Sequence, residues 1–297
     1  PLTDLAPLAV MLPVLGAAVT FMLVRRPRAQ ITVTVSALVL TLVLDALLLA
    51  AVWDTGVAAV HLGGWPAPLG ISLVVDRLSA LMLVVSALIT LAVLLYASAQ
   101  GLINRDEGGP VSIFHPTFLI LVAGVSNAFL AGDLFNLYVG FEILLTSSYV
   151  LLTMGGTAQR IRAGITYVVV SVLSSVVFLI AIAMIYAATG TVNMADLAVK
   201  LGELPTDVQM VLHVLLLVGF GIKAAVFPLS FWLPDSYPTA PAPVTAVFAG
   251  LLTKVGVYAM IRTETLLFPG EHVNALLLVV AALTTVSYTH LRAHETS

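Results

Sequence analysis

The chain has 297 residues, of which 60% are hydrophobic and only 9% are charged, and its mean hydropathy is +1.11. Soluble domains are about a quarter charged, so this composition excludes a water-soluble surface and places the chain in a lipid bilayer. The net charge of -3 indicates neither a nucleic-acid partner nor a polybasic membrane tether. The absence of cysteine excludes disulfides, thiolate metal sites and a cysteine nucleophile.

Apolar runs of about twenty residues, the length that spans a bilayer, predict an all-α polytopic membrane protein with eight to nine transmembrane helices. The eight long runs fall near 5–24, 31–53, 73–99, 116–132, 133–154, 161–188, 208–229 and 243–264. The fourth and fifth are separated by little more than AGD, so they predict a tight helical hairpin. A ninth run near 273–286, at about fourteen residues, is too short to span.

The stretches between the spans are short and leave no room for a soluble domain. Residues 191–207 predict a short amphipathic helix on the outer surface, and GGWPAPLG at 63–70 predicts a turn-rich outer loop. A polar stretch, 287–297, cuts off the ninth run and resembles translated sequencing-adapter sequence. We interpret it as a non-native tail and expect the rest to be the N-terminal part of a longer protein.

Basic residues indicate how the bundle is oriented. If the spans alternate in direction, one side carries Arg25, Arg26, Arg28, Arg105, Arg160 and Arg162, and the other carries only Arg77, Lys200 and Arg262 near its interfaces. The positive-inside rule assigns the richer side to the cytoplasm. We therefore expect a multi-pass protein of the cell inner membrane with its N-terminus outside.

Few ionisable residues remain at membrane depth, and they are Asp45, Glu142, His213, Lys223 and Lys254. A charge at the bilayer centre costs about 2.5–3.5 kcal/mol on an insertion scale. Glu142 in the fifth span, Lys223 in the seventh and Lys254 in the eighth all fall within roughly 10 Å of the midplane. One acid and two bases at similar depth can compensate one another.

These three residues are predicted to form a proton relay. Burial favours a neutral lysine and a nearby carboxylate favours a charged one, so movement of Glu142 would make Lys223 hold or release its proton. Lys254 would then be the next acceptor. The alternative is a static structural pair, but the desolvation of such a pair can exceed its Coulombic gain.

The other polar residues have less definite roles. His213, ten residues or roughly three turns before Lys223, could connect that lysine to the outer side or simply bond a neighbouring helix. Asp45 has no obvious partner, and we expect it to be peripheral, reaching an interface or a neighbouring subunit. Asp133 and Asp76, at span ends, are expected to be helix N-caps.

The seventh span is followed by a proline-rich segment that contains Pro228, Pro234, Pro238, Pro241 and Pro243. Proline removes a backbone hydrogen bond and clashes with the preceding turn, so the helix should break near Phe227–Pro228. Unpaired carbonyls at membrane depth are tolerated only against protein or water. A break beside a buried lysine therefore favours a hydrated polar pathway over an ordinary loop.

Three segments carry a resemblance to a known family: GDLFNLYVGFEILLTSSYVLL (132–152), GIKAAVFPLSFWLPDSYPTAPAPVTAVFAG (221–250) and LLTKVGVYAMIR (251–262). They resemble the proton-translocating antiporter-like subunits that Mrp-type multisubunit Na⁺/H⁺ antiporters share with respiratory complex I. Within that family the chain is most similar to the D subunits of the Mrp type. The resemblance extends from the first span to the eighth.

The resemblance implies the N-terminal part of an inverted-repeat antiporter fold. Flanking helices would occupy 1–115, the first five-helix repeat 116–265, and a truncated ninth helix 266–286. The family's functional glutamate matches Glu142, and its two lysines match Lys223 and Lys254. The family has about fourteen helices, so a second repeat and its central basic residue would be missing, and we expect that this chain cannot transport alone.

Three hypotheses remain open for the function. The first, favoured by the sequence around Lys254, is a cation/proton antiporter subunit without cofactor or metal, which would work with other Mrp-type subunits on protons and a monovalent cation. The second is a proton-pumping membrane subunit of a complex I-like NADH dehydrogenase or a membrane-bound hydrogenase. The third is a passive structural subunit.

Overall fold

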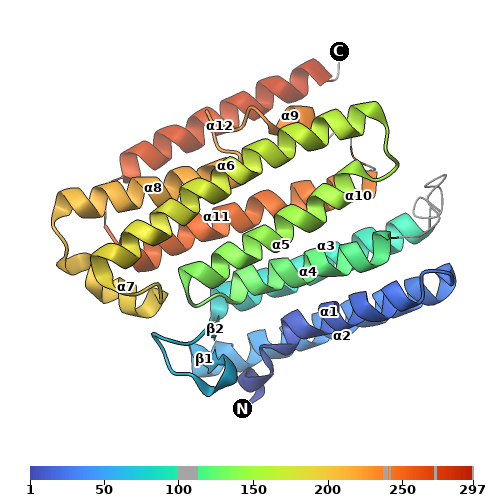
Figure 1. Ribbon diagram of the computed structural model, residues 1–297, viewed down its shortest axis with the longest axis horizontal. Helices are drawn as coiled ribbons and strands as arrows, with labels where there is room; N and C mark the ends of the chain where they lie inside the picture. The colour runs from blue at the N-terminus through green and yellow to red at the C-terminus, as the bar shows by residue number, and fades with distance from the viewer. Residues whose placement is uncertain (100–112, 237–239, 241, 271–272, 296–297) are drawn as a thin grey trace.

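The structure, a computed structural model, describes residues 1–99, 113–236, 240, 242–270 and 273–295. Most of the helices run along one long axis, and a small two-stranded sheet lies at one end (Figure 1). The elements are α1 (Leu8–Met22), α2 (Pro27–Thr55), β1 (Ala58–His61), β2 (Ser72–Val75), α3 (Arg77–Ala99), α4 (Phe114–Leu130), α5 (Leu134–Thr153), α6 (Ala158–Thr189), α7 (Met194–Lys200), α8 (Thr206–Ala224), α9 (Leu233–Ser236), α10 (Ala242–Val247), α11 (Thr253–Arg262) and α12 (Asn274–Glu295).

Among the described residues, seven helical segments are long and apolar enough to cross a membrane. They correspond to seven of the eight predicted long runs, and the remaining run forms α4, a shorter apolar helix. One of the seven is composite: α10 and α11 continue through π-helical turns at Phe248–Leu252 and Thr263–Leu267. The prediction of a helical polytopic membrane protein is thus confirmed.

Two surface segments differ in how well they match the prediction. The helix expected within 191–207 is present as α7, which Asn193 caps by accepting from the backbone N–H groups of Ala195 and Asp196. The run expected to be helical from 73 onward instead begins as strand β2, which pairs antiparallel with β1. This hairpin was not predicted, because its strands have only four residues each and their pairing depends on contacts distant in sequence.

The helix formed by the ninth run extends beyond the predicted boundary at 286, into the polar stretch. Helix α12 continues from Asn274 to Glu295, a segment without proline or glycine to stop it. Its side chains also bond the segment after α8. The Thr284 hydroxyl accepts from the Phe227 N–H at 3.0 Å, and the Tyr288 hydroxyl donates to the Ala225 carbonyl at 3.0 Å.

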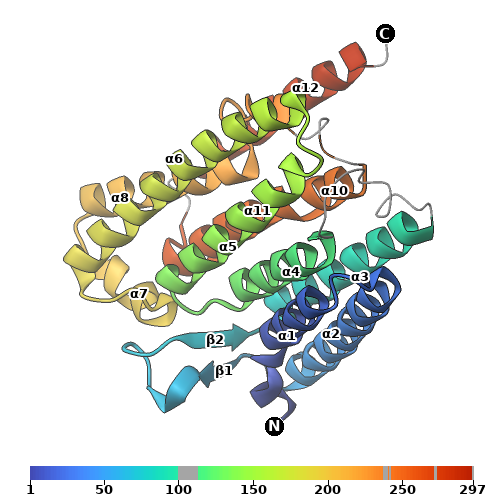
Figure 2. The same ribbon diagram turned by 45° about the vertical axis from the view of Figure 1, so that its right-hand side comes forward.

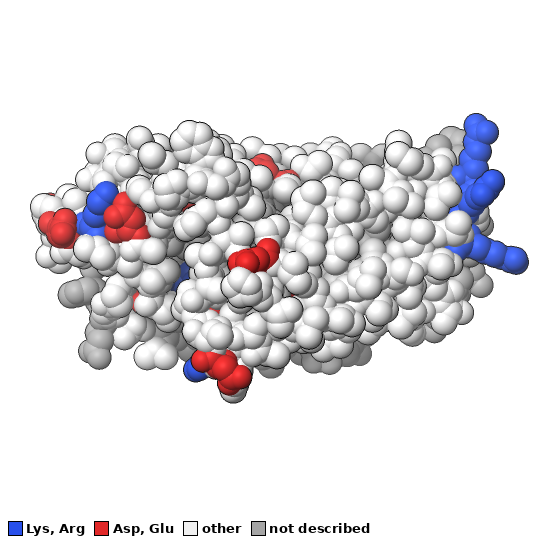
Figure 3. All heavy atoms as spheres, turned by 90° about the horizontal axis from the view of Figure 1, so that it is seen from below, with Lys and Arg blue, Asp and Glu red and all other residues white. Residues whose placement is uncertain are grey.

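The bundle has two chemically different ends. The α1–α2 and α5–α6 turns lie at one end, which we call the basic end, and the β-hairpin and α7 lie at the other, the hairpin end (Figures 1 and 2). Lys and Arg side chains group at the basic end, and a largely uncharged band lies next to them (Figure 3). Arg25, Arg26 and Arg28, in and beside the α1–α2 turn, are exposed. Arg105 lies outside the described residues.

Basic residues at the hairpin end, in contrast, are held by local partners. Lys200 pairs with Asp196 at 3.0 Å, Arg262 with Asp76 at 2.5 Å, and the Arg77 guanidinium donates to the Trp53 carbonyl at 2.9 Å. Asp76 also accepts from the Ser79 N–H, as the predicted N-cap of α3. Burial alone would raise the pKa of Asp76, but its bonds with Arg262 and Ser79 lower that pKa below the ordinary value.

Helices α8 and α11 approach most closely beside the end of α8. A Cβ added at Gly256 would lie 2.6 Å from the backbone nitrogen of Ala224 and 3.0 Å from the carbonyl carbon of Lys223. Only glycine therefore allows α11 to pack directly against the backbone of Lys223.

We expect Gly256→Ala to lower the free energy of unfolding by about 1–3 kcal/mol, because the added methyl must push two helix backbones apart. The matched control is Gly202→Ala, where no neighbouring atom lies within 4 Å of the added Cβ, and it should be neutral or slightly stabilising. Thermal unfolding of the detergent-solubilised protein measures both. Equal stability of the two variants would contradict the close packing at Gly256.

Candidate functional site

Helix α8 ends at Ala224, one residue after Lys223. The next residue, Ala225, takes the left-handed conformation with a φ of 53°, so the break predicted near Phe227–Pro228 is present and comes slightly earlier. The indole N–H of Trp232 donates to the Ile222 carbonyl at 3.1 Å. The same carbonyl also accepts from the Ala225 N–H at 3.2 Å, so the Trp232 bond is a second one, and it anchors the segment after α8 beside Lys223.

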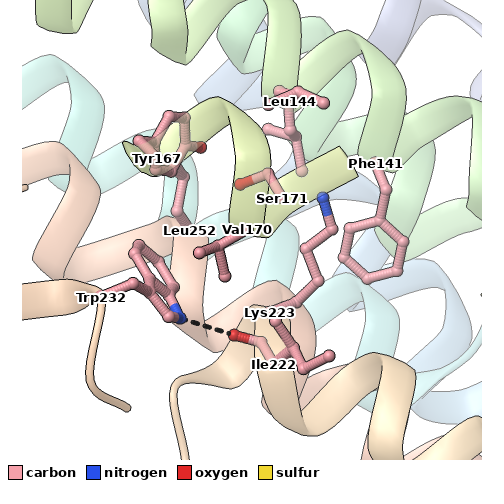
Figure 4. Close-up of a pocket in the computed structure, with 10 residues that line it drawn as sticks. Phe141, Leu144, Tyr167, Val170, Ser171, Ile222, Lys223, Trp232 and Leu252 are labelled. Carbon is pink, nitrogen blue, oxygen red and sulfur yellow. Dashed lines mark hydrogen bonds between the residues drawn. The ribbon is translucent and has the colours of Figure 1, made fainter. Parts of the chain in front are cut away.

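A small cavity lies at this break, with a volume of about 20 Å³. Helices α5, α6 and α8 form most of its wall, with Trp232 and Leu252 completing it (Figure 4). The Lys223 side chain extends into this space, where the Ser171 hydroxyl also points (Figure 4). The volume is enough for about one water molecule, which polar partners of this kind would hold.

Lys223 and Glu142 lie near each other without touching. Within the described part of the chain they form no ion pair at 4.0 Å or less, but the charge of Glu142 acts on Lys223. The Lys223 ammonium lies 5.6 Å from the centroid of the Phe141 ring, a cation–π contact. Glu142 is partly buried, and among the described residues its Oε1 has no hydrogen-bond partner.

Three buried hydroxyl groups continue from the cavity toward the basic end. Tyr167 lines the cavity, its hydroxyl lies 2.6 Å from the Ser148 hydroxyl, and it also interacts with Ser171. Ser148 is five residues before the end of α5, and Tyr167 is nine residues after the start of α6. These residues were not singled out from the sequence, where serine and tyrosine in an apolar run carry no distinguishing signal.

The structure does not bring Lys254 into this cavity. Lys254 is exposed on the described surface, and its ammonium donates to the Ala249 carbonyl at 2.7 Å and the Thr253 hydroxyl at 3.3 Å. The π-helical turn Phe248–Leu252 precedes it, and such a turn shifts the backbone hydrogen bonding that an α-helix would have. Lys254 is thus held by its own helix.

His213 has a partner that the sequence did not indicate. Its Nε2 lies 2.5 Å from Oε1 of Glu264, and its ring stacks on Phe268 with centroids 4.5 Å apart. Glu264 is the last residue of the eighth predicted run, where a carboxylate ordinarily faces the membrane surface, so no sequence pattern indicates this pair. The prediction that His213 could bond a neighbouring helix is confirmed, whereas no contact links it to Lys223 in the described structure.

Asp45 is buried inside the helical bundle, and the expectation that it is peripheral was wrong. Its side chain is on the face of α2 that packs inward, the residue is 1% exposed, and neither carboxylate oxygen has a hydrogen-bond partner among the described residues. The helical phase of α2 places it with Thr41, Leu44 and Leu48. Asp133 is the N-cap of α5, as predicted, and accepts from the Asn136 N–H at 2.7 Å.

Comparison with known proteins places this helical bundle in a family. The family model described as "NADH:quinone oxidoreductase/Mrp antiporter, TM" matches residues 131–296, which is more than half of the chain. The chain therefore belongs to this family, which includes the antiporter-like subunits that its sequence resembles.

Its relatives are antiporter subunits. The chain is 40% identical, over 95% of its length, to the D subunit of the Na⁺/H⁺ antiporter of Alkalihalophilus pseudofirmus, and it covers 57% of that protein. It is 46% identical, over 72% of its length, to the D subunit of a probable K⁺/H⁺ antiporter of Rhizobium meliloti, of which it covers 39%. The chain thus covers 57% of the length of the first relative and 39% of the second.

Chains of solved membrane complexes have a similar fold. A chain of the Mrp complex from Dietzia sp. DQ12-45-1b has a TM-score of 0.87 at 34% identity, with 94% of this chain and 52% of that one covered. A chain of an archaeal membrane-bound sulfane sulfur reductase has a TM-score of 0.86 at 30% identity, with 94% and 57% covered. A chain of respiratory complex I from Thermus thermophilus has a TM-score of 0.75 at 26% identity, with 95% and 57% covered.

We expect Tyr167→Phe to slow proton passage several-fold in the assembled complex without impairing assembly. The change removes the hydroxyl that meets Ser148 and Ser171 but keeps the ring stacked on Phe248. Tyr149→Phe on α5 is the matched control, since Tyr149 does not line the cavity. Proton flux into vesicles, measured with a pH-sensitive dye, distinguishes the two. Equal flux in both variants would exclude a role for the Tyr167 hydroxyl.

Proposed function

We propose that this chain is part of a subunit of a multisubunit cation/proton antiporter, and that protons move through a relay of Glu142, Lys223 and Lys254. The observation that carries the proposal is the placement of Lys223. It is a lysine at the end of a broken helix, extended into a small cavity inside an apolar bundle. An apolar side chain would be more stable there, so the lysine is retained for its proton.

The surroundings of Lys223 support a switchable charge. Phe141 and the small cavity favour release of the proton, because they offer little solvation to an ammonium. The Glu142 carboxylate favours retention, and its unpartnered oxygen Oε1 leaves it able to take up a closer position. A small movement of α5 relative to α8 would therefore change whether Lys223 is charged.

The cytoplasmic route to Lys223 in this proposal is the hydroxyl chain of Ser148, Tyr167 and Ser171, because it runs toward the basic end. The positive-inside rule assigns that end to the cytoplasm, which puts the N-terminus outside and the protein in the cell inner membrane. Lys254 would receive the proton from Lys223. Lys254 is exposed on α11, and a charge at this depth needs a polar partner. Lys254 is therefore suited to pass its proton on to a group beyond the described residues.

The relatives named as D subunits of cation/proton antiporters support a role in which other Mrp-type subunits are the partners and a monovalent cation is exchanged for protons. A second function, a proton-pumping subunit of a redox-driven complex, is supported by the likeness to the sulfane sulfur reductase and complex I chains. Antiport by the full-length complex in vesicles without any electron donor would separate the two.

We expect Lys223→Ala in the full-length protein to abolish antiport while the complex still assembles, because the relay needs a titratable group at this position. Lys200→Ala is the control, since Lys200 pairs with Asp196 at the surface of the hairpin end. The measurement is dissipation of a pH gradient on addition of the cation, in vesicles with matched protein content. Normal dissipation with Lys223→Ala would instead support the passive structural role.

For Glu142 we expect antiport rates in the order Glu, then Asp, then Gln. Gln keeps the volume and removes the charge, so Lys223 would stay neutral and would fail to load a proton. Asp keeps the charge with a shorter reach and should retain part of the rate. A role in packing predicts the reverse order of the two variants, because Gln matches Glu in volume. The same vesicle assay at matched expression decides between them.

A further inference from the structure

The pair formed by His213 and Glu264 belongs to a second polar region, at the hairpin end. The His213 side chain is 6% exposed and that of Glu264 is 18% exposed, with Nε2 and Oε1 2.5 Å apart. The other carboxylate oxygen, Oε2, is buried and has no hydrogen-bond partner among the described residues. A carboxylate with one free buried oxygen can accept a proton without losing its bond to the histidine.

The backbone places Glu264 in this position by a local departure from the α-helix. The turn Thr263–Leu267 is π-helical, and π-helical turns in long helices are frequent at functional sites. The preceding residue, Arg262, bonds Asp76 and Tyr258, so it does not neutralise Glu264. The Phe268 ring then covers the imidazole of His213.

A pocket of about 160 Å³ opens beside this pair. It is lined by His213 itself and by residues of α7, α8 and the segment after the π-helical turn, including Thr206, Gln209 and Phe268. At about 30 Å³ per water molecule it can hold several waters. Thr206 and Pro269 on its wall are exposed, so the pocket opens toward the hairpin end and the solvent can reach the imidazole.

The pair is separated from Lys223 by aromatic side chains. His213 and Lys223 are ten residues apart on α8, or about 15 Å along its axis. Between them Phe220 is 1% exposed and packs against Phe141 and Phe178, with ring centroids 5.9 and 4.7 Å apart. Packed aromatic rings of this kind do not relay a proton while they stay packed, so transfer between the pair and the cavity requires the rings to move apart.

We propose that His213 and Glu264 form a protonation site that exchanges a proton with the water of this pocket, on the side of the membrane that faces the hairpin end. A hydronium in the pocket gives its proton to the pair and becomes water. The pair holds that proton as a neutral carboxylic acid on Glu264, and the reverse step restores the carboxylate. This inference rests on the proposed proton transport, to which it adds an access site on the second side.

Other ionisable groups near the pair have their own partners or are exposed. On α7, Asp196 and Lys200 pair with each other, and Arg262 on α11 pairs with Asp76. Glu203 and Asp207 are exposed, while Glu271 and His272 lie outside the described residues. Among the described residues, Glu264 is therefore the partly buried carboxylate that a proton from the pocket would reach, through His213, which lines the pocket and bonds Glu264.

The test is infrared difference spectroscopy of the lipid-reconstituted complex during pH steps. We expect the parent to show a carboxylic C=O band that grows as the pH falls, and Glu264→Gln to lose it. Glu203→Gln, which changes an exposed carboxylate nearby, should keep it. His213→Gln should change the pH at which the band appears, because it replaces the hydrogen-bond partner of Glu264. A band that persists in Glu264→Gln, or one that responds to the cation but not to pH, would overturn the proposal.

Transport provides a second readout. We expect Glu264→Gln to reduce antiport several-fold and to make it insensitive to the pH on the hairpin-end side, whereas Glu203→Gln behaves as the parent. An unchanged pH response of Glu264→Gln on that side would refute the access site. The spectroscopic result does not depend on Lys223. If Lys223→Ala failed to stop transport, the proposed relay would be rejected, but the protonation of Glu264 could still be measured separately.

Discussion

The structure depends on how the chain satisfies its backbone where α8 breaks at membrane depth. Lipid offers no hydrogen bonds, so each free carbonyl there needs a partner from the protein or from water. Trp232 bonds the Ile222 carbonyl, and Tyr288 bonds the Ala225 carbonyl from α12. The break is thus closed by protein, and Trp232 also lines the small cavity into which Lys223 extends.

Close helix packing lies directly beside this polar cavity. Gly256 brings α11 against the backbone of α8, and Phe141, Phe178 and Phe220 fill the interior above Lys223. In the proposed relay, dry aromatic packing on one side of Lys223 would direct its exchange with water to the other side, and such one-sided access would keep protons from leaking through the bundle.

The charges of the chain are distributed in the same asymmetric way. At the basic end Arg25, Arg26 and Arg28 are exposed, while Arg262 and Lys200 at the other end are paired with carboxylates. Within the described part of the chain, the three arginines form no ion pair, whereas the charges of Arg262 and Lys200 are compensated locally. The polar groups inside the bundle divide likewise, with the hydroxyl chain toward the basic end and the His213–Glu264 pair toward the hairpin end.

The sequence by itself determined the spans, the caps and the break. A span is set by the length of an apolar run, an N-cap by one side chain and the next turn, and a break by proline. The position of Lys223 at the end of the broken helix followed from the same local rules. The tertiary structure alone decided which polar groups meet: Glu264 with His213, Ser148 with Tyr167, Asp45 inside the bundle and Lys254 on its surface. These outcomes depend on the rotation of each helix and on neighbours far away in the chain. Local patterns constrain that rotation poorly, because the apolar residues in a membrane helix face lipid as readily as protein.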